Sequence, residues 1–245
     1  NRGTLGKSRQ RILFRIRINM IPHYNDPNYN YQNYWNNRDY EHQSEVLAIN
    51  KLLSIFRFPF SRIADVGGGF GRHYPTLAPF AKHITLFEPS AKLRNLAKKT
   101  FPQLKVLHSF SHHLPLKAKS IDLVSMIRVA HHLTDLAPTF SEIYRVLKPG
   151  GYFLLEFANS ANFKTQLQHL FSDLPQVPIE KRSQANISKK TIAFVNHHPQ
   201  AVLKLLGNTG FKVMPRDQAA MLWEQEEEAF TTGKEGETEE EIGGN

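Results

Sequence analysis

The sequence predicts an α/β fold, in which a mostly parallel sheet carries helices on both of its faces. Short apolar runs alternate with segments of helical apolar spacing between residues 62 and 157. This alternation is typical of parallel strands that are joined by crossover helices. A glycine-rich turn links the first apolar run to the segment that follows it. The length of 245 residues suits one such domain with a sizeable core.

Several classes of protein are excluded by composition. The chain has no cysteine, so it has no disulfide, no thiolate metal site and no cysteine nucleophile. This composition fits a reducing compartment, and we expect a cytoplasmic protein. No apolar run reaches about 18 residues, so no membrane span is expected.

The formal net charge of +9 is unevenly distributed along the chain. Residues 1–19 carry six Arg or Lys and no acid, and we expect a basic arm that is disordered or artefactual. Residues 219–245 are rich in Glu, which predicts an acidic, disordered tail. The basic body could attract an anionic partner, but no stacking or base-reading motif supports nucleic acid as that partner.

Apolar spacing and chain-breaking residues predict the elements in order. A helix is expected over 45–56, where apolar residues follow helical spacing. Ser90 is a good N-cap for the helix at 91–100, and Lys148-Pro-Gly-Gly151 is expected to end the helix at 136–147. The expected strands are 62–66, 83–87, 104–107, a strand with its outlet over 120–132, 152–157 and 211–214, and the other helices are 72–82, 163–170 and 200–206.

The glycine-rich turn is the most informative stretch of the chain. Asp65-Val-Gly-Gly-Gly-Phe-Gly71 follows an apolar strand and precedes a helical segment. Glycine allows the backbone to approach a ligand closely, and the N–H groups at a helix start favour negative charge. Glu88 ends the next apolar run. Its separation along the sequence from the glycine-rich turn is typical of an acid that binds a ribose diol. These features predict a site for a nucleoside-containing ligand.

The spacing of the glycines argues against a dinucleotide. A dinucleotide fingerprint needs G-x-G-x-x-G. Here the third glycine position holds Arg72 or Tyr74, depending on where the pattern begins. A nucleotide-dependent dehydrogenase therefore ranks last among the functions considered.

Together with the run at 120–132 and Val146-Leu-Lys-Pro-Gly-Gly-Tyr-Phe-Leu-Leu155, these motifs resemble the class I S-adenosylmethionine-dependent methyltransferases, in particular the type 11-like domain. The resemblance covers roughly residues 34–214. It implies a Rossmann-like, three-layer α/β/α fold, S-adenosyl-L-methionine as the cofactor and a small-molecule methyl acceptor. The antiparallel last strand of that family is missing or altered here. The implied division is an N-terminal lid and helix at 20–60 and the methyltransferase domain at 61–218, with a substrate-selecting insert at 159–191.

The resemblance also implies a set of cofactor-binding residues. Ser109 stands where many members carry an acid that reads the adenine amino group, and Phe110 could stack on the adenine instead. Arg38 could pair with the methionine carboxylate, or the aromatic residues near it could simply cover the sheet. The implied set is Asp65, Gly67, Gly68, Gly69, Glu88, Pro89, Ser109, Phe110, Arg128, Tyr34 and Arg38.

Catalytic and substrate-binding candidates lie near the ends of later strands. His131 and His132 are general-base candidates, with metal binding or capping as alternatives. Glu156 is either a further base or a partner for Arg128. His197 and His198 are substrate-side candidates, with helix capping as the alternative. No metal site is expected.

Two other functions stay open at this point. An RNA or protein methyltransferase would account for the basic charge, although the chain lacks the Asn-Pro-Pro-aromatic motif of amino methylation. A non-catalytic S-adenosylmethionine-binding domain would account for Ser109 and for the missing last strand.

Overall fold

The computed structural model describes residues 24–36, 38–56, 59–159, 179–182 and 192–214. The expected basic arm, the acidic tail and the helix predicted at 163–170 lie outside these ranges, as does most of the expected insert at 159–191.

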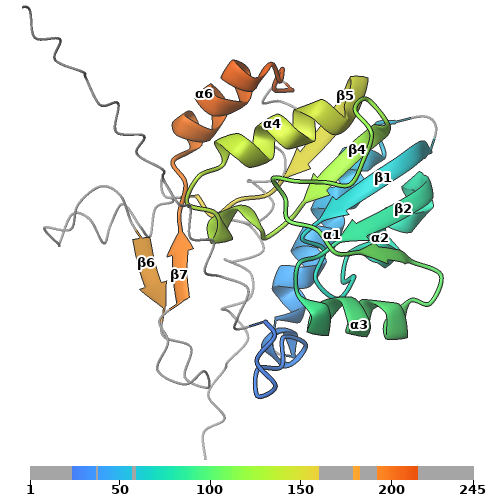
Figure 1. The fold of residues 1–245 in the computed structure, drawn as a ribbon, viewed down its shortest axis with the longest axis vertical. Helices are drawn as coiled ribbons and strands as arrows, with labels where there is room; N and C mark the ends of the chain where they lie inside the picture. Colours follow the sequence, from blue (N-terminus) through green and yellow to red (C-terminus); the bar gives the residue numbers. More distant parts are fainter. Residues whose placement is uncertain (1–23, 37, 57–58, 160–178, 183–191, 215–245) are drawn as a thin grey trace, which may run out of the picture.

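Five strands form the main sheet, in the order β3-β2-β1-β4-β5, and every pairing is parallel (Figure 1). The predicted parallel sheet is confirmed. Its strands are apolar on both faces because helices cover both faces. The strands are β1 (Phe60–Val66), β2 (Ala81–Phe87), β3 (Lys105–Leu107), β4 (Ile121–Met126) and β5 (Leu147–Leu155).

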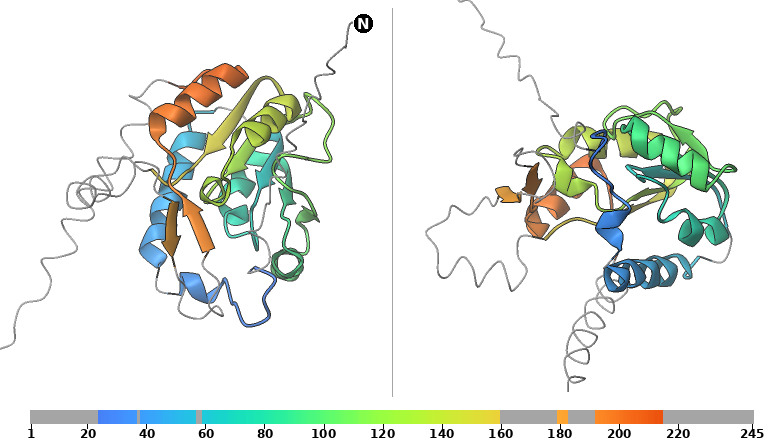
Figure 2. Two further views of the ribbon diagram at one scale, coloured as in Figure 1. Left: turned by 60° about the vertical axis from the view of Figure 1, so that its left-hand side comes forward. Right: turned by 90° about the horizontal axis from the view of Figure 1, so that it is seen from below.

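Helices cover the sheet in two layers, as Figures 1 and 2 show. On one face, α4 (Ala137–Val146) and α6 (Pro199–Thr209) pack on Ala64 and Val66 of β1. On the other face, α1 (Asp39–Leu53) and α2 (Tyr74–Leu77) pack on Ile63, and α3 (Ala91–Thr100) packs on β2 and β3. Alternate residues of a strand point to opposite faces, which gives the predicted three-layer arrangement.

The helices before β2 differ from prediction. The helix expected at 72–82 is a single turn, α2, followed by the 3-10 helix η2 (Ala78–Phe80). Pro79 lies in η2 and has no N–H to continue an α-helix. The helix expected at 45–56 begins earlier, at Asp39, where two acids in its first turn favour a helix N-terminus.

Helix α4 ends slightly before Lys148-Pro-Gly-Gly151, where the sequence predicted its end. Helix α4 already ends at Val146, and β5 begins at Leu147. Ile121 pairs with Leu147 and Leu123 pairs with Tyr152, so the four intervening residues form a bulge. Gly150 has φ +76° in this bulge, a conformation that glycine adopts without strain.

Helix α6 is longer than predicted. It continues through Gly207 and ends at Thr209, and Gly210, with φ of +105°, supplies the left-handed cap. The strand predicted at 211–214 does not form. Phe211 instead packs against Phe153 of β5, with ring centroids 5.5 Å apart.

A separate two-stranded sheet pairs β6 (Ile179–Arg182) with β7 (Ile192–Val195) in antiparallel register. Strand β6 falls within the expected insert, and β7 contacts the 3-10 helix η3 (Ala130–His132) that follows β4. Among the helices in the described ranges, none has the length and apolar character needed to cross a bilayer. Location in the cytoplasm stays a prediction.

Candidate functional site

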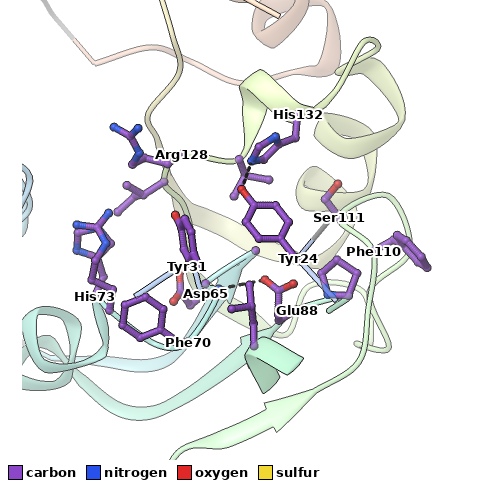
Figure 3. A pocket seen from close by; sticks show the side chains of 18 of the residues that line it. Tyr24, Tyr31, Asp65, Phe70, His73, Glu88, Phe110, Ser111, Arg128 and His132 are labelled. Carbon is purple, nitrogen blue, oxygen red and sulfur yellow. Dashed lines mark hydrogen bonds between the residues drawn. The ribbon is translucent and has the colours of Figure 1, made fainter. Parts of the chain in front are cut away.

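A crevice of about 990 Å³, including its open mouth, lies at the carboxyl ends of β1, β2 and β4 (Figure 3). Ligands bind at this place in open parallel sheets. Its walls combine the glycine turn, apolar side chains and a few polar groups. The lining residues are Tyr24, Tyr31, Asp65, Gly67, Gly68, Gly69, Phe70, Arg72, His73, Glu88, Pro89, Leu93, Phe110, Ser111, His112, Ile127, Arg128, Val129, His132 and Leu133.

The glycine turn needs its glycines for both conformation and space. Gly67 and Gly69 have φ of +72° and +60°, which strains residues with side chains. A Cβ on Gly67 would collide with the side chain of Val129. The backbone N–H of Gly67 donates to the carbonyl of Phe87 at 2.7 Å, which ties the turn to β2. The turn therefore brings bare backbone to the floor of the crevice.

Asp65 lies beneath this turn and supports it. Its side chain is only 3% exposed, and the Ser125 hydroxyl donates to its Oδ1 at 2.8 Å. A Cβ on Gly68 would meet the other carboxylate oxygen. Burial raises the pKa of Asp65 to about 6. The buried carboxyl group of Asp65 thus links β1 to β4 and occupies the space beside Gly68.

Glu88 connects the turn to helix α3. Its Oε2 accepts the Gly69 N–H at 3.0 Å, and its Oε1 accepts the Ser90 N–H at 2.7 Å. Burial raises the pKa of Glu88 to about 7, although these two hydrogen bonds favour its ionised form. Each carboxylate oxygen has a further acceptor site. The carboxylate could therefore hold a diol while it holds the turn.

Residues 24–36, here named the N-terminal strap, bring the side chains of Tyr24 and Tyr31 to the crevice (Figure 3). The Lys92 ammonium anchors the strap to α3 by donating to the carbonyls of Asp26, Pro27 and Tyr29 at 2.8, 3.1 and 2.6 Å. The ring of Tyr31 lies near Gly69. Because Tyr24 and Tyr31 line the crevice, the strap supplies part of its wall.

One end of the crevice is cationic. The carboxylate of Glu45 pairs with Arg72, with His73 at 3.0 Å and with Arg128 at 3.5 Å. Burial alone would raise the pKa of Glu45, but the His73 hydrogen bond and the Arg72 charge lower it below its ordinary value. Burial lowers the pKa of His73. Two guanidinium charges therefore face one carboxylate, which favours an anionic group of a ligand.

Three side chains at this end resemble a metal-ligand set. The ligand atoms of His42, Glu45 and His73 lie within 4.8 Å of one another. However, Arg72 donates to the Nδ1 of His42 at 2.7 Å and also pairs with Glu45. The guanidinium already supplies the positive charge that a metal would bring, so this cluster is a charge network around Arg72.

Most of the predicted cofactor residues meet in the crevice. Three do not line it. Tyr34 accepts a hydrogen bond from Arg128 at 3.3 Å, Arg38 pairs with Glu41 at 2.6 Å, and Ser109 donates to backbone carbonyls of its own turn. The predicted residues that do line it are Asp65, Gly67, Gly68, Gly69, Glu88, Pro89, Phe110 and Arg128.

Among the catalytic candidates, His132 lines the crevice. Its neighbour His131 is buried and packs against it, with ring centroids 4.1 Å apart. Glu156 accepts the backbone N–H of Arg128 at 2.6 Å. Arg128 has φ +58°. Glu156 thus partners the backbone of Arg128, whereas the guanidinium of Arg128 pairs with Glu45.

The two substrate-side candidates are not among the lining residues and make structural contacts. His197 Nε2 donates to the carbonyl of Ala130 at 2.9 Å. His198 is the N-cap of α6, and its Nδ1 accepts the N–H of Gln200. Capping was the alternative interpretation of this pair.

Sequence reasoning missed residues that only the fold brings to the crevice. Tyr24 and Tyr31 lie in a stretch that reads as loop, and its density of tyrosine was the one available signal. Arg72 and His73 directly follow the glycine turn, so their place beside the ligand site could have been expected. Phe70, Ser111 and His112 also line the crevice, and each adjoins a motif that was singled out.

Residues 64–155 match the model of the methyltransferase domain family. The matched segment contains the glycine turn, Glu88 and the outlet of β4. This segment of the chain is therefore similar to the methyltransferase domains that the sequence motifs predicted.

The chain is also similar to individual methyltransferases of several organisms. The chain is 31% identical over 165 residues to a demethylmenaquinone methyltransferase of Chlorobaculum tepidum, covering 62% of this chain and 65% of that protein. It is 27% identical over 118 residues to a ubiquinone/menaquinone biosynthesis C-methyltransferase of Campylobacter jejuni, covering 45% and 50%. A solved S-adenosylmethionine-dependent methyltransferase of Thermotoga maritima shares the fold, with TM-score 0.54, 20% identity and coverage of 75% and 78%.

Proposed function

We propose that the chain is an S-adenosylmethionine-dependent methyltransferase that acts on a small-molecule acceptor. One observation carries the proposal: Glu88 holds the N–H of Gly69 at the carboxyl edge of a parallel sheet, so the predicted ribose acid and the glycine turn meet in one crevice. The names of the two quinone-methylating relatives support a small acceptor. The bound cofactor would supply a methyl group that is already electrophilic, so the chain mainly has to align it and exclude water.

The residues present fit the parts of this cofactor. Glu88 has acceptor sites for the ribose diol, and Phe110 offers a ring for the adenine. Arg72 and Arg128 suit the methionine carboxylate. The Nδ1 of His73 is buried and lacks a hydrogen-bond partner within the described part of the chain, so the cofactor's ammonium group would be a suitable donor to it.

Calorimetric titration with S-adenosylhomocysteine tests the proposal. We expect the intact chain to bind the ligand, and we expect Asp65→Ala and Gly67→Arg to abolish binding. Gly207→Arg is the matched control for the second change, because a Cβ at Gly207 meets nothing within 4 Å. Circular dichroism would confirm that each variant is folded. A wild-type chain that binds no S-adenosylhomocysteine would refute the proposed function.

A further inference from the structure

Two side chains from distant parts of the chain meet over the crevice. The hydroxyl of Tyr24, in the strap, lies 2.8 Å from Nε2 of His132, in η3. Their rings are nearly perpendicular, at 84°, with centroids 5.5 Å apart. Both residues line the crevice, and Figure 3 shows the Tyr24 ring between His132 and Glu88. A hydroxyl and an imidazole are thus held together at the carboxyl end of β4.

The surroundings of Tyr24 favour the neutral form of its phenol. Burial raises the pKa of Tyr24 well above its ordinary value, and the nearby Tyr31, Tyr29 and Glu88 add to the effect, whereas Arg128 opposes it. The phenol therefore keeps its proton, and it donates to Nε2 of His132 in the imidazole tautomer that carries its proton on Nδ1. A phenolic oxygen that donates in this way can also accept a hydrogen bond from a ligand hydroxyl.

The crevice around the pair favours a flat, apolar ligand. Its wall includes aromatic rings from Tyr31 and Phe70 as well as aliphatic side chains from the segment that follows β4. Aromatic ligands stack on such rings or meet their edges. Pockets for small molecules typically combine an apolar wall with a few polar groups that fix orientation. Tyr24 and His132 supply such a polar pair.

We propose that Tyr24 and His132 form a proton relay for a methyl acceptor that carries a hydroxyl group on an aromatic ring. This inference rests on the proposed function and deepens it by naming the acceptor class. The acceptor hydroxyl passes its proton to the Tyr24 oxygen while Tyr24 passes its own proton to Nε2 of His132. The acceptor oxygen then bonds to the methyl carbon supplied by the sulfonium, and the sulfur keeps the electron pair of the broken bond. Proton removal of this kind contributes roughly 10²–10⁴-fold to rate.

The strap contacts explain how Tyr24 is held for this role. The Ser90 hydroxyl donates to Asn25 Oδ1 at 2.8 Å and to the Tyr24 carbonyl at 3.3 Å. Ser90 is also the N-cap of α3, where its side chain accepts the N–H of Leu93. The backbone of Tyr24 is therefore fixed to a helix end, and its side chain reaches across to η3.

The test uses 4-nitrophenol, whose ionised form absorbs visible light, added to the chain saturated with S-adenosylhomocysteine. At about pH 6 the free phenol is mostly neutral, so a relay that takes its proton should increase the phenolate band on binding. We expect Tyr24→Phe and His132→Asn to remove this increase. Tyr29→Phe, a matched loss of a hydroxyl from the same strap at a residue that does not line the crevice, should retain it.

A second readout is turnover with labelled S-adenosylmethionine. With 4-methylphenol, which is neutral near pH 8, Tyr24→Phe and His132→Asn should lower the rate by roughly 10²-fold or more. With 4-nitrophenol, which is already ionised there, they should change it much less. If the chain binds S-adenosylhomocysteine but neither binds nor methylates a phenol, or if the variants behave as the wild type does, the relay is wrong. If it binds no S-adenosylhomocysteine, the proposed function itself fails.

Discussion

Glu88→Gln tests the electrostatics of the crevice in the cofactor-free chain. The pKa of Glu88 is raised from 4.5 to about 7 in the folded protein because the carboxyl is buried. An unfolded chain gives up this proton near its ordinary pKa, so between about pH 4 and pH 7 the folded state binds more protons than the unfolded state. The contribution of Glu88 is therefore fully present below about pH 4 and is lost as the pH rises through about 7.

The size of the effect follows from the shift. A rise from 4.5 to about 7 corresponds to roughly 3 kcal/mol of unfolding free energy lost across that window, at about 1.4 kcal/mol per pKa unit. Glutamine cannot ionise, so the variant lacks this loss. Only the oxygen of its amide group accepts hydrogen bonds, so the NH₂ group leaves one of the two N–H donors that Glu88 accepts without an acceptor. This loss costs roughly 1–3 kcal/mol at every pH. The informative quantity is therefore the change in stability with pH and not the stability itself.

Urea unfolding at about pH 5 and pH 8 measures this quantity. We expect the wild type to lose more stability than Glu88→Gln over this interval. Glu142→Gln is the control, because the hydrogen bond and charge of Arg145 lower the pKa of Glu142, so that its contribution is lost only as the pH falls below this interval. Equal pH dependence in the wild type and Glu88→Gln would refute the reasoning.

Three further predictions concern the frame of the site. Gly71→Ala should destabilise the chain by roughly 1–3 kcal/mol in urea unfolding. The φ angle of Gly71 is +84°, and the new Cβ would lie 3.1 Å from the Phe101 ring. Unchanged stability would contradict this account. Lys92→Met removes three charged hydrogen bonds to the strap. Amide hydrogen exchange over residues 24–31 should therefore accelerate on the order of tenfold. Equal exchange rates in the wild type and the variant would contradict the role of Lys92 in anchoring the strap. Phe140→Ala should cost about 3–5 kcal/mol of unfolding free energy by calorimetry, because this ring is fully buried. A loss below about 1 kcal/mol would contradict this prediction and show that neighbouring side chains fill the space that the ring leaves.

The periodicity of the sequence determined the class of fold. Apolar runs at β1, β2 and β4 need cover on both faces, and this requirement leaves few arrangements other than a parallel sheet between helices. The element boundaries were less well determined. Pro79 shortened α2, and the glycine at 207 did not end α6, since packing can override the local preference of a single residue.

The sequence also located the part of the site that local backbone builds. The turn at residues 67–69 and Glu88 are each defined by the strand before them, so their meeting could be predicted from the order of strands. Arg38 and Tyr34 could not be placed in this way, because the strap that precedes α1 has no periodicity to fix its path.

Only the tertiary structure decided what surrounds that turn. Tyr24 and His132 are separated by 108 residues and yet form one hydrogen bond, and Glu45 joins Arg72 to Arg128 from a third element. Local sequence specifies the conformation of a turn or the start of a helix, because those depend on neighbouring residues. Which distant side chains share a cavity depends on how the packed layers bring strap, helices and strand ends together, and no local pattern records that arrangement.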